Sequence, residues 1–216
     1  EFTIPTAIKD IPYGMFSGCT SLTKVTFHED IKSIGANVFS NCTSLETITI
    51  PSGVTEISSN LFENCSSLKE VVLPDNLTSI GQYAFSKCKS LEKIDLPVTL
   101  TSIGKEAFEG CNFKEIIVPN DVVKIEKNAF NGCNLLEKIT IPFVGTEKNN
   151  GHDSNFDIIF GQIPQTLKEV IVSTDAKISP ASFRKTANIE KLTLPYVGAI
   201  GYDHTMTNIG GIFGLS

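Results

Sequence analysis

The sequence predicts an α/β repeat fold: a right-handed solenoid in which about nine short strands form one parallel β-sheet, with short helical or 3₁₀ turns on the opposite side. Three observations support this. Six cysteines recur every 22 or 23 residues, a phenylalanine precedes each by three positions, and a proline follows most strand-like segments. A fixed period of this length indicates stacked coils, because one coil cannot bury its own apolar side.

Residues 57–73 and 80–96 show the repeat most clearly. In both, an isoleucine is followed in turn by a phenylalanine, a cysteine and a leucine at fixed spacing, and a proline comes directly after the segment. This period and the apolar spacing after the leucine are typical of leucine-rich-repeat solenoids. We expect Ile80, Phe85 and Cys88 to point inward, so that the phenylalanines form the largest column of the core.

Nine segments are expected to form the sheet. They are short, rich in Val, Ile and Thr, and alternate between apolar and polar residues, as half-buried strands do. The proline after most of them lacks an N–H group, so it ends the strand ladder and turns the chain. The expected strands are residues 2–4, 22–27, 45–50, 68–73, 91–96, 113–118, 136–141, 167–172 and 189–194.

The composition bounds the class of protein. The chain has 216 residues, of which 41% are hydrophobic and 19% charged, so we expect one solenoid domain over residues 1–216. A net charge of -6 with a single arginine argues against nucleic-acid binding. No run reaches 18 apolar residues, so no membrane span is expected in this segment. Because the chain starts in an expected strand and stops at a core phenylalanine, we expect a longer array.

The cysteines permit two interpretations: a disulfide or metal framework, or a column of small buried hydrophobes. Side chains stacked between coils leave in the same direction, so their Cβ atoms stay about 4.8 Å apart. A disulfide needs about 3.8 Å. We therefore predict free thiols in one core column, formed by Cys19, Cys42, Cys65, Cys88, Cys111 and Cys133.

Two columns of charge run along the expected sheet, and in each the sign alternates from coil to coil. This arrangement specifies register, because a slip of one coil would bring like charges together. A strip for an ionic ligand is the alternative, and it is weakened because the two columns nearly cancel. The first column is Thr23, Glu46, Lys69, Glu92, Lys114, Glu137, Lys168 and Glu190, and the second is Lys24, Thr47, Glu70, Lys93, Glu115, Lys138, Glu169 and Lys191.

A third column on the same face is β-branched and only weakly charged. It suits a broad contact surface better than a pocket. We therefore predict partner contacts at Thr49, Val72, Asp95, Ile117, Thr140 and Ile171.

Two coils are enlarged, at residues 142–161 and 195–214, and they share a Pro-aromatic-Val-Gly start and an Ile-Phe-Gly end. Insertions in solenoids map to loops on one side, often a binding side. The donors in these loops fit neither a calcium nor a zinc pattern, which weakens the interpretation as a metal site. Contact with a partner and a solvated loop that serves the fold alone are the other two interpretations. The candidate contact residues are Asn149, Asn150, His152, Asp153, Tyr202, Asp203 and His204.

The sequence contains no constellation for catalysis. Nucleophilic chemistry needs a serine or cysteine beside a base, whereas the cysteines are assigned to the core and His28 stands alone at a strand end. A glycine-rich phosphate loop and a His-Glu-x-x-His helix are both missing. We predict no enzyme and no cofactor.

The repeat resembles the BspA-like leucine-rich repeats, found in surface and secreted proteins of gut and oral bacteria and some parasitic protists. Residues 80–88 (IGQYAFSKC) and 103–111 (IGKEAFEGC) match best, and the resemblance covers nearly the whole chain. Departures are Pro12 and Glu126 in the glycine place, Phe113 after a one-residue deletion, and Ser173 in a proline place. They affect local geometry rather than the fold.

The resemblance implies a function without catalytic residues. Family members are regarded as adhesins or interaction surfaces for host matrix proteins or other cells. We therefore expect an extracellular or cell-surface binding module whose partner is a host or cell-surface protein. The alternative is a structural spacer that presents another domain of a larger surface protein.

Overall fold

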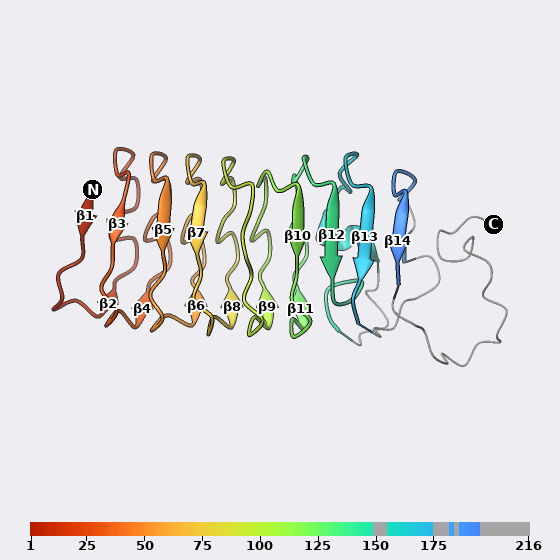
Figure 1. Cartoon of the computed structure of the whole chain (residues 1–216). Coiled ribbons are helices and arrows are strands. Elements are labelled where there is room, and N and C mark those ends of the chain that lie inside the picture. Colours follow the sequence, from red (N-terminus) through yellow and green to blue (C-terminus); the bar gives the residue numbers. More distant parts are fainter. Residues whose placement is uncertain (149–154, 175–181, 184–185, 195–216) are drawn as a thin grey trace.

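The computed structural model describes residues 1–148, 155–174, 182–183 and 186–194. The chain winds into a parallel β-solenoid whose coils stack along one axis (Figure 1). Each coil has three sides: a sheet face, a second row of short strands, and a turn side. The prediction of a repeat solenoid is confirmed, and its core is one continuous cluster of apolar side chains from Ile4 to Phe183.

The sheet face carries strands of two to four residues, shorter than expected because only part of each segment pairs in register with a neighbouring strand. Inward residues such as Ile48 and Ile139 are buried, and the residues beside them face solvent. The strands are β1 (Phe2–Thr3), β3 (Val25–Thr26), β5 (Thr47–Thr49), β7 (Glu70–Val72), β10 (Glu115–Ile117), β12 (Lys138–Ile141), β13 (Glu169–Val172) and β14 (Lys191–Thr193).

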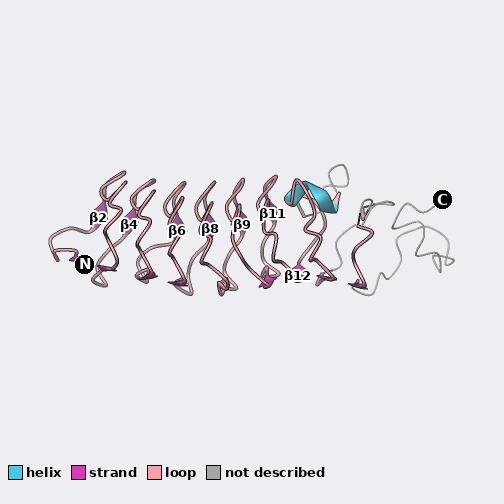
Figure 2. Cartoon of the chain, turned by 90° about the horizontal axis from the view of Figure 1, so that it is seen from above, coloured by secondary structure: helices cyan, strands magenta, loops and turns pink. Residues whose placement is uncertain are grey.

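The expectation of a single sheet is wrong, because a second row of parallel strands runs along another side of the stack (Figure 2). Each strand is a two-residue pair whose isoleucine is buried. Gly81 follows one of them, and a Cβ there would lie 2.7 Å from Ser59 N, so the glycine permits close approach of the coils. The row comprises β2 (Asp10–Ile11), β4 (Ser33–Ile34), β6 (Glu56–Ile57), β8 (Ser79–Ile80), β9 (Ser102–Ile103) and β11 (Lys124–Ile125).

The turn side consists of hydrogen-bonded turns, and within the described residues only η1 (Phe156–Ile159) is a 3₁₀ helix. Asn60 and Asn64 have positive φ values of 57° and 59°, a conformation that asparagine tolerates better than most residues. Such residues interrupt a helix and aim N–H groups at the next coil. Asn60 N donates to Gln82 O at 2.9 Å, and Phe62 N donates to Ala84 O at 2.8 Å. The coils are therefore joined by backbone hydrogen bonds on this side as well.

The phenylalanines of the turn side form the predicted core column. Phe39, Phe62, Phe85 and Phe108 are fully buried, and neighbouring rings stack with centroids 5.3 to 5.5 Å apart. Phe160 continues the column from the first enlarged coil, 6.0 Å from the Phe130 ring.

The cysteines are free thiols, as predicted, and five of the six are buried. Each buried thiol donates a hydrogen bond to the phenylalanine carbonyl of the preceding coil; Cys88 Sγ, for example, lies 3.1 Å from Phe62 O. Cys19, in the first coil, is exposed, so the expectation of six core cysteines is wrong at this one position. Its coil is followed, but not preceded, by another described coil.

The first enlarged coil is partly built into the core. Phe143 and Val144 are buried, and Ile125 N donates to Thr146 O at 2.8 Å. Lys124 and Glu147 form an antiparallel bridge, so the segment after Pro142 runs back along β11. The described start of this coil therefore packs against the second row. Residues 149–154 and the second enlarged coil lie outside the described residues.

Candidate interaction surface

The predicted contact column exists as an aligned row on the sheet face. Thr49 pairs in register with Val72, and Ile117 pairs with Thr140, which pairs in turn with Ile171. Val72 is 46% exposed and Ile117 is 59% exposed, values that are high for large apolar side chains in a folded protein. The alternation of the strands thus places apolar side chains in solvent.

Asp95 interrupts this row. Residues 91–96 form no strand, and among the described residues no backbone hydrogen bond joins residues 92–96 to β7 or β10. The expected strand at 91–96 is therefore wrong. In the next coil, Phe113 takes the leucine position after the one-residue deletion and packs edge-on against Phe108, 5.5 Å away. We attribute the interruption to this larger side chain and shorter coil. The contact column is consequently divided into a β5–β7 part and a β10–β14 part.

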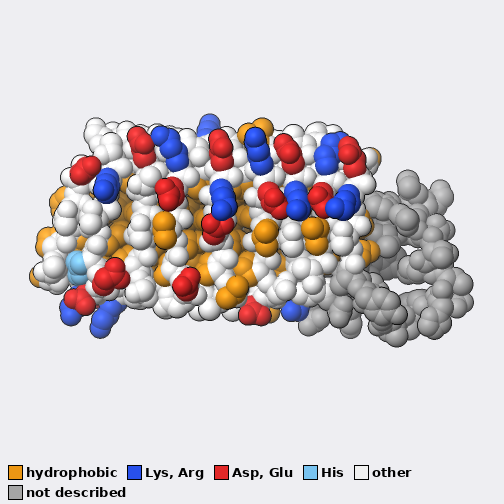
Figure 3. Space-filling model, viewed as in Figure 1, with side chains coloured by type: hydrophobic (Ala, Val, Ile, Leu, Met, Phe, Trp, Pro, Cys, Tyr) orange, Lys and Arg blue, Asp and Glu red, His pale blue; other side chains and the backbone are white. Residues whose placement is uncertain are grey.

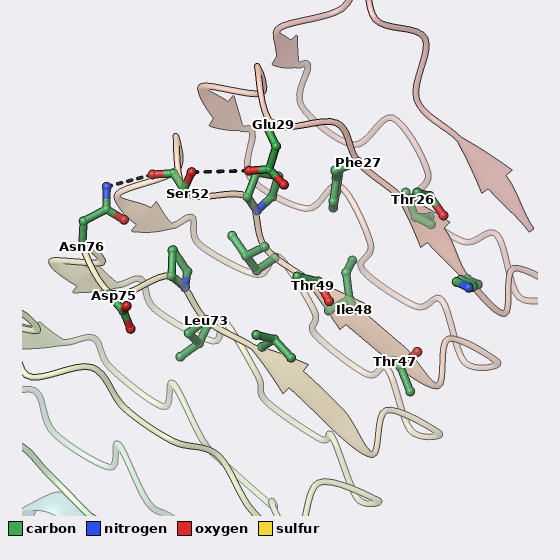
Figure 4. Close-up of a pocket in the computed structure, with 16 residues that line it drawn as sticks. Thr26, Phe27, Glu29, Thr47, Ile48, Thr49, Ser52, Leu73, Asp75 and Asn76 are labelled. Carbon is green, nitrogen blue, oxygen red and sulfur yellow. Dashed lines mark hydrogen bonds between the residues drawn. The ribbon is translucent and has the colours of Figure 1, made fainter.

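A groove of about 730 Å³ lies on the sheet face over β3, β5 and β7 and the turns that follow them (Figure 4). We call it the sheet-face groove. Phe27, Ile48 and Leu73 contribute its apolar lining. Thr49 and Val72 of the contact column also line it, so the β5–β7 part of the predicted column lies in this groove.

Polar residues from the turns form one edge of the sheet-face groove. Ser52 Oγ donates to Glu29 Oε2 at 3.4 Å, and Asn76 Nδ2 donates to the backbone oxygen of Ser52 at 2.8 Å (Figure 4). Asp75 lies beside Asn76 on the same edge. Three successive coils therefore contribute to one polar edge with two carboxylates.

The alternating charge columns lie beside the contact column (Figure 3). Lys69 Nζ is 2.9 Å from Glu46 Oε2, and Lys138 Nζ is 2.9 Å from Glu115 Oε1. The hydrogen bond that Lys138 donates to Glu115 raises the pKa of Lys138. Similar pairs, Lys168 with Glu190 and Lys191 with Glu169, continue the columns. The structure thus shows pairing of opposite charges between coils, as the register hypothesis requires.

The loop candidates lie outside the described residues: Asn149, Asn150, His152, Asp153, Tyr202, Asp203 and His204. Their role in partner contact stays a prediction. Over the described ranges, no group of three or more His, Cys, Asp and Glu side chains is arranged to hold a metal ion. A search of the same ranges for a helix long and apolar enough to cross a membrane finds none.

Sequence reasoning missed the edge of the sheet-face groove. Glu29, Ser52 and Asn76 follow the strands in turns, where polar residues are expected for solvation alone, so they gave no signal of a site. Phe27 carried a weak signal, since it is an aromatic residue at a strand end where later coils have Ile, Leu or Val. Only the stacking of coils brings these residues to one place.

A model of the BspA type leucine rich repeat region matches the chain in six copies, over residues 1–88 and 55–171. The chain therefore belongs to the BspA type leucine-rich-repeat family, a family of repeat scaffolds rather than a catalytic one. This confirms the resemblance drawn from residues 80–88 and 103–111. No functionally curated protein matches the sequence.

Solved structures of bacterial repeat proteins are similar to this chain. A leucine-rich repeat protein from Bacteroides ovatus is 35% identical, with 65% of this chain and 43% of that one covered and a TM-score of 0.50. The T. pallidum leucine rich repeat protein is 29% identical, with coverage of 65% and 64% and a TM-score of 0.54. Pneumococcal vaccine antigen PcpA, at 20% identity, coverage of 90% and 68% and a TM-score of 0.54, shows the fold alone. The chain spans less than two thirds of the first two proteins.

Proposed function

We propose that this chain is a non-enzymatic binding or adhesion module, extracellular or on a cell surface, that contacts a protein partner through its sheet face. The observation that carries the proposal is the exposure of Val72 and Ile117, which occupy the outward position of the repeat in the two parts of the contact column. Membership of the BspA type family supports the location, since the resemblance implies surface and secreted proteins. Apart from Asp95, the residues of the column are β-branched and lose little side-chain conformational entropy on binding.

The charge columns are consistent with contact by a protein. Their pairs neutralise each other between coils, so the sheet face presents no large field of one sign. A partner is then selected by shape and apolar contact at the column. The loop residues from Asn149 to Asp153 and from Tyr202 to His204 are proposed as further contacts.

A spacer is the second candidate, and a specific observation favours it. Backbone hydrogen bonds join most successive coils on the sheet face and in the second row, and they also join coils on the turn side. Such a stack resists bending and suits a stalk that presents another domain.

The test measures binding of the chain to immobilised collagen, laminin and fibronectin by biolayer interferometry. Ile117→Asp on the sheet face is compared with Val123→Asp, whose side chain is 50% exposed next to the second row. We expect saturable binding to at least one protein, weakened at least tenfold by Ile117→Asp and less than twofold by Val123→Asp. Equal effects of the two variants, or no saturable binding at all, would contradict the sheet-face module and favour the spacer.

A further inference from the structure

We propose that the sheet-face groove binds a short extended polypeptide segment of the partner that carries lysine or arginine next to apolar side chains. This inference rests on the proposed function, because it names the partner chemistry of the same face.

The groove has the size of a short peptide site. It spans three coils, and parallel strands lie about 4.8 Å apart, so its outer strands are about 10 Å apart. An extended chain advances about 3.3 Å per residue, which gives room for about three or four residues along the stack. Its volume of about 730 Å³ lies within the range of ligand sites in proteins.

The lining offers both apolar and hydrogen-bonding contacts. Phe27 and Leu73 are half-buried, and Val72 stands exposed between them and the charge columns. The hydroxyl groups of Thr26 and Thr49 stand on the exposed side of their strands (Figure 4). Apolar side chains of a bound segment would pack on Phe27, Leu73 and Val72. Its backbone N–H and C=O groups would form hydrogen bonds with the two threonine hydroxyls.

The edge gives the groove its charge preference. Glu29 and Asp75 are exposed, and neither takes part in an ion pair of the described chain. Glu46, by contrast, lies on the neighbouring charge column and is paired with Lys69. The lining also includes Lys24, so the groove has two carboxylates against one cation, and the two carboxylates at its edge attract a cationic side chain. They also disfavour nucleic acids and anionic membrane surfaces, which carry the same sign of charge.

The experiment measures fluorescence anisotropy of three labelled hexapeptides with the purified chain. The first, Gly-Leu-Lys-Val-Lys-Gly, combines apolar and basic residues. The second, Gly-Leu-Glu-Val-Glu-Gly, reverses the charge, and the third, Gly-Ser-Lys-Ser-Lys-Gly, removes the apolar side chains. We expect the first to bind at least fivefold more tightly than either of the others. Equal affinity for all three, or no saturable binding, would overturn the proposal.

Variants locate the binding. The double variant Glu29→Gln, Asp75→Asn should weaken the first peptide at least fivefold. The matched control is Asp121→Asn, an exposed acidic residue in the turn after β10 and away from the groove, which should change the affinity less than twofold. Equal losses in both variants would mean general charge attraction and would overturn the site.

Two further results distinguish the peptide site from a dimer interface and from the sheet-face module as a whole. Sedimentation velocity of the chain alone should show a monomer; a dimer dissociated by Val72→Asp would assign the groove to a second copy and overturn the peptide site. If the peptides fail while Ile117→Asp still weakens binding to a matrix protein, the groove is wrong and the sheet-face module stands.

Discussion

The turn side and the sheet face are built from the same repeat but differ in how completely they are buried. On the turn side, Phe62, Phe85 and Cys88 are 0% exposed, and hydrogen bonds link their backbones to the neighbouring coils. On the sheet face, Val72 and Ile117 are exposed and the ladder is interrupted at residues 92–96. The turn side therefore holds successive coils together, whereas the outward positions of the sheet face can accept different side chains.

The difference follows from geometry. Both the ring of Phe85 and the thiol of Cys88 point into a core that the next coil covers, so any change of volume is felt by two neighbours. A side chain on the outer side of a strand meets only its neighbours along the column. Substitutions should therefore lower the free energy of unfolding strongly on the turn side and only weakly on the sheet face.

The largest effect is expected from Phe85→Ala. The ring is fully buried between Phe62 and Phe108, so its removal should lower the free energy of unfolding by about 3 to 5 kcal/mol. Val72→Ala on the sheet face serves as the control and should cost about 0.5 kcal/mol or less. Urea unfolding followed by circular dichroism measures both. Similar losses for the two variants would refute the distinction between the sides.

The turn side was also the part best predicted from sequence. The spacing of Phe85 and Cys88 in the 23-residue repeat determined that both point inward, because stacked coils leave one apolar side to bury. The second row was missed because a Ser-Ile pair is too short to show alternation. The short turns expected on the turn side are present as single hydrogen-bonded turns. Asparagine and glycine at positive φ, as at Asn60 and Gly110, keep them from continuing into a longer helix.

The candidate surface was predictable only in part. Alternation identified the outward positions Thr49, Val72, Ile117, Thr140 and Ile171, since side chains of a strand point to opposite faces in turn. It could not show the interruption at Asp95, which we attribute to Phe113 and the shorter coil that follows. Nor could it show the groove, because Glu29 and Asp75 are 46 residues apart and meet only through stacking.

A second, smaller effect concerns pH. Burial raises the pKa of the Cys133 thiol from 9.0 to about 12. In the unfolded chain the thiol ionises near its ordinary value, while in the folded chain it stays protonated. The stabilisation is therefore complete below about pH 9 and is lost as pH rises toward 12. Its slope approaches about 1.4 kcal/mol per pH unit for one thiol.

Cys133→Ala tests this directly. The free energy of unfolding, measured between pH 8 and pH 10.5, should fall less steeply in this variant than in the parent chain. Cys19→Ala, at the exposed cysteine, is the matched control for the loss of a thiol. Equal slopes in Cys133→Ala and the parent would show that the turn-side thiol is already open to water.

The smallest effect is expected on the sheet face, at the pair of Lys138 and Glu115. The two side chains are 33% and 48% exposed, so their interaction should be worth about 0.2 to 1 kcal/mol and should weaken in 1 M salt. A double-mutant cycle of Lys138→Gln and Glu115→Gln measures it.

Lys138→Glu separates register from stability, since it places a third carboxylate between Glu115 and Glu169. We expect it to cost more than Lys138→Gln; equal costs would mean that the alternating columns do not oppose a slip of one coil.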